Sequence, residues 1–386
     1  MGRKTTALVT GGAGLIGSHI ADQALAAGWD VRILDNLQPR THRTGLPAWV
    51  PPAAEFVRGD VRHRRVWERA LDGVDVVFHE AAWGGYMPQI AKFIETNGVG
   101  TALMLETIRD RRLPVRKVVV ASSQAVYNEG AYDCPDHGRF YGTPRPIARL
   151  ARGEYDVVCP ICGAASAPAP IDEEAPIGGA NVYAISKLVQ ERLTLSWGEA
   201  TGIPAVALRY SCTYGPRQSL TNPYTGVIAI FCTRLVNGRP PVVYEDGRQS
   251  RDLIFVEDVA AANLLVATDP RADGRVFNVG TGQAVAIADL ANLLACRLGV
   301  AIEPLLPGEY RPGEMRALIS DNGRIGTLGF APKTALAVGI DRYLDWVRAQ
   351  GEIADYFAAA ERVLRRRSVV KRADAGGSMT AAGTQR

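Results

Sequence analysis

A glycine-rich turn between a buried strand and a helix constrains the fold of this chain more than any other feature. The apolar run TALVT leads directly into TGGAGLIG at 10–17, and the helical pattern LIGSHIADQALAAG overlaps its end. Gly12, Gly14 and Gly17 fit the spacing G-x-G-x-x-G, and a wider-spaced variant that starts at Gly11 fits equally well. Such glycines allow a tight turn, close approach of the backbone to a pyrophosphate, and close packing of the helix on the strand. The turn therefore predicts the first βα unit of a doubly wound sheet, with an anion at the helix N-terminus.

The first 125 residues repeat this unit of strand and helix. VRILD, VDVVFHEAA and KVVVASS are continuous β-branched runs, which is typical of strands buried on both faces, and segments with helical spacing separate them. The alternation predicts a Rossmann-like, doubly wound parallel α/β sheet. We place this domain at 1–210, a smaller α+β domain partly interwoven with it at 211–345, and a terminal helix with a disordered basic tail at 346–386. The pattern of the last segment favours one long helix over 340–366.

Composition and charge exclude several classes of protein. No apolar run reaches the ~18–20 residues that span a bilayer, and the first strand begins too early to leave room for a signal peptide. We therefore expect a cytoplasmic protein that binds no membrane, with its six cysteines reduced or bound to metal. From Arg362 onward, seven Lys/Arg and one acid hold +6, which leaves −2 of the total charge of +4 for the rest of the chain. Because no aromatic residues are interleaved in this basic tail, we expect no nucleic-acid partner.

An acidic residue at the end of the second strand indicates which dinucleotide is bound. Asp35 lies 21 residues after the central glycine of the turn, where a carboxylate can accept hydrogen bonds from both ribose hydroxyls of an adenosine. The same carboxylate repels a 2′-phosphate, so the sequence favours NAD over NADP, although Arg32 and Arg40 lie nearby. Asp60 and Val61 follow the third short strand, where they can flank the adenine.

A tyrosine and a lysine one helical turn apart offer proton-transfer chemistry. Tyr183 and Lys187 belong to the run YAISK within a helical pattern, so both side chains lie on one face of the helix. A nearby ammonium lowers the pKa of a phenol, which can then exchange a proton with a sugar or alcohol hydroxyl near neutral pH. Alone, this pair is common on helix surfaces. A serine in ASSQAVY, at the end of a buried strand, would face the same cleft and complete a catalytic set.

Taken together, these motifs resemble those of the extended short-chain dehydrogenases/reductases, in the NAD-dependent nucleotide-sugar epimerase/dehydratase family. The resemblance covers about residues 5–345 and rests on TGGAGLIG, HEAA, NGVGT, ASSQAVY, YAISK, LRYSCTYGPRQ and RDLIFVEDVA. It implies the catalytic residues Ser123, Tyr183 and Lys187, and a homodimer formed through the helix at 88–111 and the helix that bears the tyrosine. It also implies a wider set of cofactor-binding residues, with Ser122 nearest the nicotinamide: Gly11, Gly14, Leu15, Ile16, Gly17, Asp35, Asn36, Asp60, Val61, Glu80, Ala81, Ala82, Asn97, Ser122, Tyr183, Lys187 and Tyr210.

The residues after the catalytic serine separate the reactions of this family. Relatives that dehydrate at C6 or decarboxylate resemble one another in carrying Asp-Glu or Glu there, because elimination needs a further acid and base. This chain has Gln124 and Ala125, neither of which can carry a proton in that role. The resemblance then implies 4-epimerisation of a nucleotide sugar through a transient 4-keto intermediate, or, as the alternative, reduction of a 4-keto nucleotide sugar in a deoxysugar pathway. The intact catalytic set argues against a silent scaffold or an RNA-binding relative.

Several residues match positions at which family members hold the nucleotide of the substrate. Arg251 in GRQSRD and Arg311 in RPGE stand where relatives grip the diphosphate, and a guanidinium fork suits phosphate oxygens. Glu314 stands where relatives hold an acid near the nucleotide, and Asn222 in TNPYTGV is a further candidate contact. The chain departs from the family by reading RYSC where relatives usually read RYFN, which alters the floor of the sugar pocket.

Two turns with paired metal ligands, CPDHG and CPICG, lie between the catalytic serine and tyrosine. They place Cys134 and His137 before Cys159 and Cys162, with 21 residues between the pairs, a spacing typical of small structural zinc sites. Four protein ligands leave no open position, so we expect a structural zinc that fixes the inserted loop at 128–172. With TNPYTGVIAIF and NGRPPVVYEDGRQSRD, this insertion resembles the bacterial dTDP-L-rhamnose 4-epimerase type, which implies a dTDP-6-deoxyhexose substrate such as dTDP-L-rhamnose.

Overall fold

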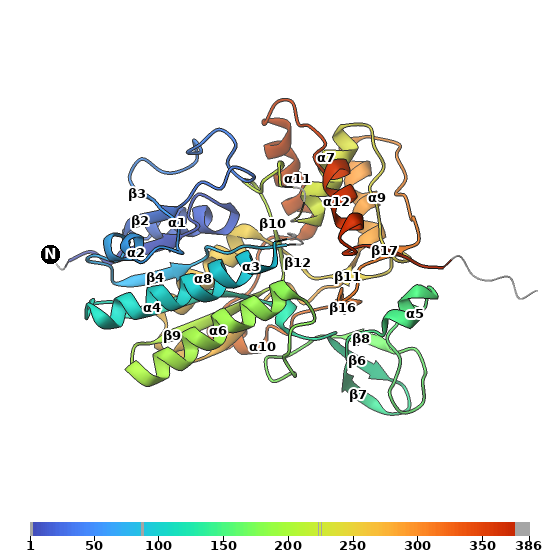
Figure 1. Ribbon diagram of the computed structural model, residues 1–386, viewed down its shortest axis with the longest axis horizontal. Helices are drawn as coiled ribbons and strands as arrows, with labels where there is room; N and C mark the ends of the chain where they lie inside the picture. The colour runs from blue at the N-terminus through green and yellow to red at the C-terminus, as the bar shows by residue number, and fades with distance from the viewer. Residues whose placement is uncertain (1–2, 86–88, 223, 225, 375–386) are drawn as a thin grey trace, which may run out of the picture.

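The largest sheet is parallel throughout and has the strand of the glycine-rich turn near its middle (Figure 1). The computed structural model describes residues 3–85, 89–222, 224 and 226–374. The seven strands lie in the order β13-β9-β5-β4-β1-β2-β3, and their bounds are β1 Thr6–Thr10, β2 Asp30–Asp35, β3 Glu55–Arg58, β4 Val76–His79, β5 Lys117–Ser123, β9 Ala205–Tyr210 and β13 Val276–Val279. Strand order reverses between β1 and β4, so the carboxyl ends of these strands open a crevice there. The predicted Rossmann-like fold is confirmed.

Helices cover both faces of this sheet because successive strand residues point to opposite sides. Leu8 packs with Trp67 and Met104 in a buried cluster on one face, and Val9 packs with Ile20 in a cluster on the other. The first layer holds α2 (Arg64–Ala70), α4 (Gly100–Asp110) and α6 (Val182–Thr201), and the second holds α1 (Leu15–Ala26) and α8 (Val256–Thr268). The continuous apolar strands of the sequence are therefore buried on both sides.

The helical stretch after β4 is not one regular helix. It consists of α3 (Ile90–Phe93), a π-helical turn η1 (Ile94–Val99) and α4. Position 88, at which we expected the helix to begin, lies outside the described residues. Turns of π-helix commonly occur at functional sites, and this one carries the buried side chain of Asn97 toward the loop that follows β4.

The smaller part of the molecule is a helical cluster with short strands. Its core is formed by α7 (Val227–Val236), α9 (Ile287–Leu298) and α11 (Leu336–Arg348). The short strands of this part are β10 (Cys212–Tyr214), β11 (Ser250–Arg251), β12 (Leu253–Phe255), β14 (Val285–Ala286) and β16 (Ala317–Leu318). The short helices α10 (Gly323–Gly326) and η3 (Pro270–Ala272) pack instead with the core of the large sheet. Between β12 and β14 the chain returns to the large sheet as α8 and β13, so the two parts are interwoven.

The insertion forms a small antiparallel sheet of its own, at the lower right of Figure 1. Its strands lie in the order β7-β6-β8. After the short turn η2 (Gln124–Val126) come β6 (Ala131–Cys134), β7 (Gly138–Tyr141), α5 (Ile147–Ala151) and β8 (Ala167–Ala169). Strand β6 lies at the centre and carries the first metal-ligand turn at its end.

The expected single helix over 340–366 is wrong. The chain leaves α11 at Arg348, passes through Gly351 at φ +72°, and begins a separate helix α12 at Phe357–Arg366. Strand β17 (Lys371–Arg372) then pairs with β15 (Glu309–Tyr310), so the tail that we expected to be disordered is ordered as far as residue 374. Residues 375–386 lie outside the described residues. No helix in the described part of the chain is long and apolar enough to cross a membrane.

Candidate active site

The glycine-rich turn leaves no room for side chains. Gly11 has φ +64°, and a Cβ atom there would lie 3.0 Å from the backbone of the loop after β4. A Cβ at Gly17 would lie 2.5 Å from the carbonyl oxygen of Gly11. Gly14 is the N-cap of α1 and supplies no side-chain cap, while Leu15 and Ile16 of the first helical turn line the large cavity described below. This geometry lets an anion approach the helix N-terminus closely.

The carboxylate of Asp35 ties the end of β2 to the glycine-rich turn. Its two oxygens accept hydrogen bonds from the backbone N–H groups of Ala13, at 3.1 Å, and Leu37, at 2.8 Å. The side chain is buried at the carboxyl edge of the sheet. It therefore lies where the ribose of an adenosine at the helix N-terminus would reach it.

Asn36 and Asp60 meet on the outer side of this acid. The Asn36 amide donates to a carboxylate oxygen of Asp60 at 3.0 Å, and the Arg62 guanidinium donates to the same carboxylate at 3.0 Å. Although burial acts in the other direction, hydrogen bonds from Arg62 and Asn36 lower the pKa of Asp60 to about 2. The carbonyl of Val61 accepts a hydrogen bond from the indole of Trp67 at 2.7 Å, so this strip of backbone is fixed.

A neutral histidine holds the loop that follows β4. The ring of His79 contacts the hydroxyls of Thr10, at 2.8 Å, and Thr101, at 3.0 Å. Burial, together with the charge of Lys187, lowers the pKa of His79 to about 3. The Thr10 hydroxyl also accepts the backbone N–H of Ala81 at 3.0 Å, which fixes this residue against the glycine-rich turn.

Asn97 holds the next part of the same loop. Its side chain accepts the backbone N–H of Trp83 at 2.8 Å and donates to the Trp83 carbonyl at 3.0 Å. It also donates to the hydroxyl of Ser186 on α6 at 2.8 Å. Ala82 is thereby fixed between two anchored neighbours, and Asn97 supports the loop rather than lining the cavity.

The two serines at the end of β5 point in opposite directions. The Ser123 hydroxyl accepts the backbone N–H of Ala125 at 3.1 Å and forms a hydrogen bond with the phenol of Tyr183. The Ser122 hydroxyl donates to a buried carboxylate of Glu191 at 2.6 Å. The structure thus brings Ser123 and Tyr183 together, whereas the Ser122 hydroxyl is engaged by Glu191, two turns further along the same helix α6.

Lys187 and Tyr183 lie on the same helix, but the lysine is engaged elsewhere. Its ammonium donates to the carbonyl of Ala121 at 2.6 Å and to the side chain of Gln190 at 2.7 Å, and burial lowers its pKa to about 8. We expected a nearby cation to lower the pKa of Tyr183. In the protein alone burial raises that pKa instead, and the hydrogen bond with Ser123 only partly opposes it.

Glu80 adds an acid to this region. The hydroxyl of Tyr210 donates to its carboxyl at 3.0 Å and accepts the amide of Asn263 at 2.8 Å. Burial raises the pKa of Glu80 to about 7, although the charge of Lys187 and the hydrogen bond from Tyr210 act in the other direction. The charges of Glu80 and of Lys187 on α6 therefore influence each other's pKa.

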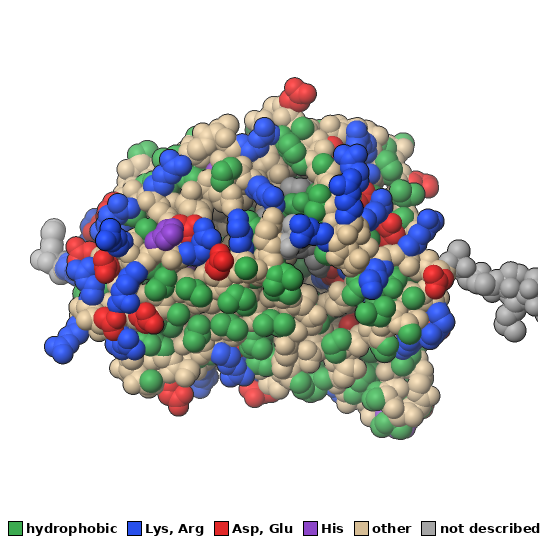
Figure 2. Space-filling view, viewed as in Figure 1, with side chains coloured by type: hydrophobic (Ala, Val, Ile, Leu, Met, Phe, Trp, Pro, Cys, Tyr) green, Lys and Arg blue, Asp and Glu red, His purple; other side chains and the backbone are tan. Residues whose placement is uncertain are grey.

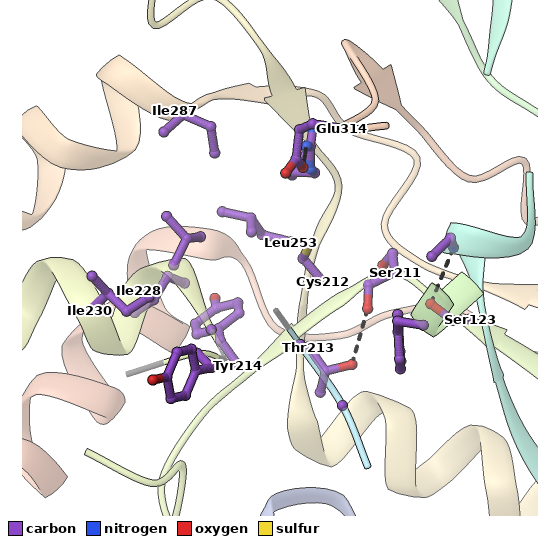
Figure 3. Close-up of a pocket in the computed structure, with 18 of the residues that line it drawn as sticks. Ser123, Ser211, Cys212, Thr213, Tyr214, Ile228, Ile230, Leu253, Ile287 and Glu314 are labelled. Atoms are coloured by element: carbon purple, nitrogen blue, oxygen red, sulfur yellow. Dashed lines mark hydrogen bonds and ion pairs between the residues drawn. The ribbon is translucent and has the colours of Figure 1, made fainter. Parts of the chain in front are cut away.

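A cavity of about 520 Å³ joins the end of β5 to the smaller part of the molecule (Figure 3). This volume suits a small-molecule ligand. Ser123 and Ser211 lie together on one side of the cavity, and Glu314 and Ile287 lie on another. The predicted site residues that line it are Leu15, Ile16, Ser122, Ser123, Tyr183, Tyr210, Asn222, Arg251, Arg311 and Glu314.

Two guanidinium groups share one carboxylate in the wall of this cavity. Arg251 forms an ion pair with Glu314, and Arg311 lies 3.6 Å from the other oxygen of the same carboxylate. Arg311 also lies over the ring of Tyr244, 4.4 Å from its centre. Asn222 is buried nearby and accepts a backbone hydrogen bond. The guanidinium forks in this wall have the planar donor geometry that suits a phosphate group.

Several buried polar atoms of the cavity wall have no hydrogen-bond partner among the described residues. They include Gln124 Oε1, Ser211 Oγ, Gln218 Oε1 and Gln249 Oε1. A buried polar atom left in this way costs free energy unless a ligand or water supplies a partner. The sequence flagged Gln124 and Ser211 only as departures from relatives; the two other glutamines lie inside the motifs LRYSCTYGPRQ and GRQSRD, which could have pointed to them.

The structure also brings the four predicted metal ligands together. The Cys134 sulfur lies 3.7 Å from the Cys162 sulfur, and Nδ1 of His137 lies 3.6 Å from the Cys134 sulfur and 3.7 Å from the Cys159 sulfur. All four ligand atoms lie within 4.8 Å of one another. A disulfide needs about 2.05 Å between sulfurs, so the thiols are free. The glycine that ends each turn has positive φ, +71° and +75°, which closes the turn around the ligands.

Comparison with known proteins places this geometry in a family. The description "NAD dependent epimerase/dehydratase family" applies to residues 7–148 and 159–280. A dTDP-L-rhamnose 4-epimerase of Burkholderia thailandensis is 34% identical over 349 residues, covering 88% of this chain and 94% of that protein. UDP-glucose 4-epimerase of Thermus thermophilus, solved with NAD, is 30% identical with a TM-score of 0.70, and the match covers 90% of this chain and 100% of that one. The enzyme of the same name from Thermotoga maritima, solved with UDP-glucose, is 27% identical with a TM-score of 0.74 and the same coverage. The chain belongs to the NAD-dependent epimerase/dehydratase family.

Proposed function

We propose that this protein is an NAD-dependent nucleotide-sugar 4-epimerase. One observation carries the proposal: a single cavity has Ser123 and Tyr183 in one part of its wall and Arg251 and Arg311 in another. The first pair can act on a sugar hydroxyl, and the second can hold a diphosphate. Gln124, which also lines the cavity, stands where dehydration would need an acid.

The residues around the glycine-rich turn fit NAD. Gly11 and Gly17 leave space for a pyrophosphate at the N-terminus of α1, and Asp35 lies where it can accept ribose hydroxyls but would repel a 2′-phosphate. Solved relatives with bound NAD support this choice. When bound, NAD⁺ supplies a hydride acceptor at C4 of the sugar and later returns the hydride to the opposite face.

The protein supplies proton transfer and orientation. Tyr183 takes the proton of the C4 hydroxyl, and Ser123, which already forms a hydrogen bond with this phenol, holds the C4 oxygen. Lys187 becomes available to a cofactor ribose and to the tyrosine when it leaves the carbonyl of Ala121. Because burial raises the pKa of Tyr183 in the protein alone, the phenol must release its own proton to solvent before it can act as the base, and the positive charge of Lys187 would favour this release.

The distribution of polar groups suits a sugar that must rotate within the cavity to present its opposite face. Arg251 and Arg311 hold the diphosphate at a distance from the reacting carbon, so the sugar can rotate while the nucleotide stays bound. Unpartnered oxygens of Ser211 and Gln218 can accept sugar hydroxyls in either orientation. We infer that the substrate is a dTDP-6-deoxyhexose such as dTDP-L-rhamnose, supported by the likeness to the Burkholderia thailandensis protein.

The decisive experiment is incubation with dTDP-L-rhamnose and other nucleotide sugars without added cofactor, followed by NMR of the H4 signals. Appearance of a C4 epimer with no net change in NADH supports the epimerase and identifies the substrate. If conversion occurs only when NADH and a 4-keto sugar are added, the protein is a 4-keto-sugar reductase and the epimerase proposal is wrong. Absence of any bound dinucleotide in the purified protein would count against both.

We infer that the cluster in the insertion holds a structural zinc. A tetrahedral zinc with bonds of ~2.3 Å to sulfur and ~2.0–2.1 Å to nitrogen separates two sulfurs by about 3.8 Å and a sulfur from a nitrogen by about 3.6 Å. The sulfur–sulfur separation of 3.7 Å and the nitrogen–sulfur separations of 3.6 and 3.7 Å agree with these values. Backbone N–H groups of Cys162 and Ile161 lower the pKa of the Cys159 thiol to about 7, which favours the thiolate that binds metal.

Metal analysis tests the zinc. We expect one zinc per chain, lost in Cys159→Ser together with thermal stability, and retained in Cys296→Ser, which changes an exposed cysteine outside the cluster. Protein without stoichiometric zinc, combined with unchanged stability of Cys159→Ser, would contradict the assignment.

We also infer a homodimer formed through α3, η1 and α6. Figure 2 shows hydrophobic side chains gathered over these helices. The apolar residues exposed there are Ile90, Ile94, Val99, Ile185 and Leu193, with exposed fractions of 65, 40, 47, 45 and 37%. A surface of this kind marks a protein interface.

Sedimentation of Ile94→Glu should show monomers, and that of Val338→Glu, a matched change on α11, should show dimers. A wild-type protein that sediments as a monomer would refute the inference.

A further inference from the structure

A buried cluster of ions joins the insertion to the wall of the cavity. Its central members are Glu129, Arg145, Glu245 and Arg316, with exposed fractions of 1, 8, 4 and 4%. The first two belong to the insertion, and the last two belong to segments that also carry Tyr244 and Glu314 of the cavity wall. Residues far apart in the sequence therefore meet in one small buried volume.

Arg145 contacts both carboxylates of this cluster. Its two terminal nitrogens donate to the two carboxylate oxygens of Glu245, both at 2.9 Å. The same nitrogens donate to the carbonyls of Tyr155, at 2.8 Å, and Glu314, at 2.7 Å, and Nε lies 3.4 Å from Glu129. A planar guanidinium can make this set of bonds, whereas an ammonium cannot.

Arg316 completes the cluster from the opposite side. It pairs with Glu245 at 3.1 Å, with Asp246 at 2.6 Å, and with Asp156 of the insertion at 2.7 Å. Its backbone N–H donates to Glu129. The insertion thus contacts the segment that runs from Glu314 into β16 at two separate points, Glu129 and Asp156.

These contacts fix the residues that hold the phosphate-binding arginines. Glu245 has φ +53°, a backbone conformation that residues other than glycine rarely adopt. The two hydrogen bonds from the Arg145 guanidinium to its carboxylate hold it there. Its neighbour Tyr244 lies under Arg311. Because Arg145 also binds the carbonyl of Glu314, both sides of the arginine–carboxylate set depend on one guanidinium of the insertion.

The metal-ligand turns connect to the same cluster. Tyr132 and Val157 lie two residues before Cys134 and Cys159, and their side chains pack with Ala317, the residue after Arg316. A metal that joins the turns therefore also fixes these two residues against β16. The cluster is more than a source of stability, since buried ion pairs contribute little net stability compared with apolar residues of the same volume.

We propose that Arg145 is a positioning residue: through it, the metal-closed insertion holds Arg251, Glu314 and Arg311 in the arrangement that binds a nucleoside diphosphate. This proposal rests on the proposed function, because it concerns the same cavity. It assigns the insertion a role in substrate binding and none in dinucleotide binding.

Arg145→Lys is the first test, because it keeps the charge and loses the fork. We expect the Kd for dTDP, measured by calorimetry, and the KM for the nucleotide sugar to rise on the order of tenfold. We expect kcat to change less than about twofold and bound dinucleotide to stay at the wild-type level. Arg139→Lys, an exposed arginine of the same insertion, is the control and should match wild type. Folded Arg145→Lys with wild-type dTDP affinity and KM would overturn the proposal.

Further measurements decide the remaining cases. If Arg145→Lys does not fold, Asp156→Asn removes only a half-exposed partner of Arg316, and its dTDP Kd should rise about threefold; unchanged affinity overturns the proposal. Cys162→Ser should lose the metal, and its Kd for dTDP should rise in the same way. Wild-type protein that binds dTDP but converts no sugar refutes the proposed function alone, since the dTDP comparison still applies. Wild-type protein that binds neither dTDP nor UDP overturns both.

Discussion

The side of the site proposed for the dinucleotide and the side proposed for the nucleotide sugar are built in different ways. The first is formed by short continuous runs at the carboxyl ends of β1, β2, β4 and β5, where a parallel sheet collects them automatically. The second is formed by single residues such as Arg145, Glu245, Arg251 and Glu314, which meet only through tertiary packing. We therefore expect mutations on one side to weaken dinucleotide binding alone and mutations on the other to weaken nucleotide-sugar binding alone. Only changes on α6, which bears Tyr183 and Lys187, should affect the reaction of both.

The largest effect is expected where the two sides meet. Tyr183→Phe removes the proton-transfer group, and we expect kcat to fall by about 10³. Dinucleotide content and dTDP affinity should stay unchanged, because the ring is retained. Tyr141→Phe, a change to an exposed tyrosine of the insertion, is the matched control. If kcat falls by less than about tenfold, a group other than Tyr183 transfers the proton.

Gly17→Ala should damage the dinucleotide side alone. The new Cβ would lie 2.5 Å from the Gly11 carbonyl oxygen, so the turn must move and the first turn of α1 with it. We expect the affinity for NAD to fall on the order of 100-fold, a loss of about 2.7 kcal/mol. The dTDP Kd should stay at its wild-type value. Loss of both affinities in folded protein would show that the two sides are coupled more tightly than their construction suggests.

Arg251→Met is the reverse experiment. Loss of a charge-assisted contact to a diphosphate costs about 1.5–3 kcal/mol, which corresponds to a rise of about 10- to 100-fold in KM and in the dTDP Kd. Bound dinucleotide should be retained. The exposed Arg248→Met, three residues earlier, serves as the control. A variant that releases its dinucleotide while keeping dTDP affinity would reverse the assignment of the two sides.

The same contrast explains which features were predictable from the sequence. The parallel sheet, Asp35 after its strand, and the pairing of Ser123 with Tyr183 follow from local patterns that a fold of this class brings together. The ligand cluster around Cys134 was predictable because metal ligands come in short, regular pairs. The ion cluster around Arg145 was not, since none of its members has a pattern and each would pass as a surface charge in the sequence.

Two errors have the same physical origin. The tail was expected to be disordered because it is basic, but Arg365 pairs with Glu309 at 3.0 Å and β17 finds an edge in β15. The pKa of Tyr183 was expected to be low because Lys187 lies one turn away. The structure shows burial outweighing this, with the ammonium held by Ala121. Spacing predicts proximity, but the balance of charges depends on the surroundings.

Glu80 lies at the junction of the two sides and should make stability depend on pH. Burial raises its pKa from 4.5 to about 7, so the folded protein binds this proton more tightly than the unfolded chain. Its contribution is full below pH 4.5 and is lost as pH rises to 7, while Lys187 titrates above this range. Glu80→Gln should therefore gain about 2 kcal/mol relative to wild type between these pH values, measured by urea unfolding. Parallel pH curves for the two proteins would contradict this, and the exposed Glu352→Gln controls for loss of a carboxyl.

The smallest expected effect separates a residue that faces a ligand from one that merely fills the core. The Ser211 hydroxyl is buried in the cavity wall and has no partner among the described residues. Ser211→Ala should leave the free energy of unfolding unchanged or slightly higher, because an unsatisfied polar atom is removed. If the hydroxyl faces the sugar, as we propose, the KM for the nucleotide sugar should rise about threefold, whereas the dTDP Kd should not change. A fall in stability with unchanged KM would show that Ser211 is a core residue. Sugar recognition would then depend on the glutamines of the cavity wall, Gln124, Gln218 and Gln249.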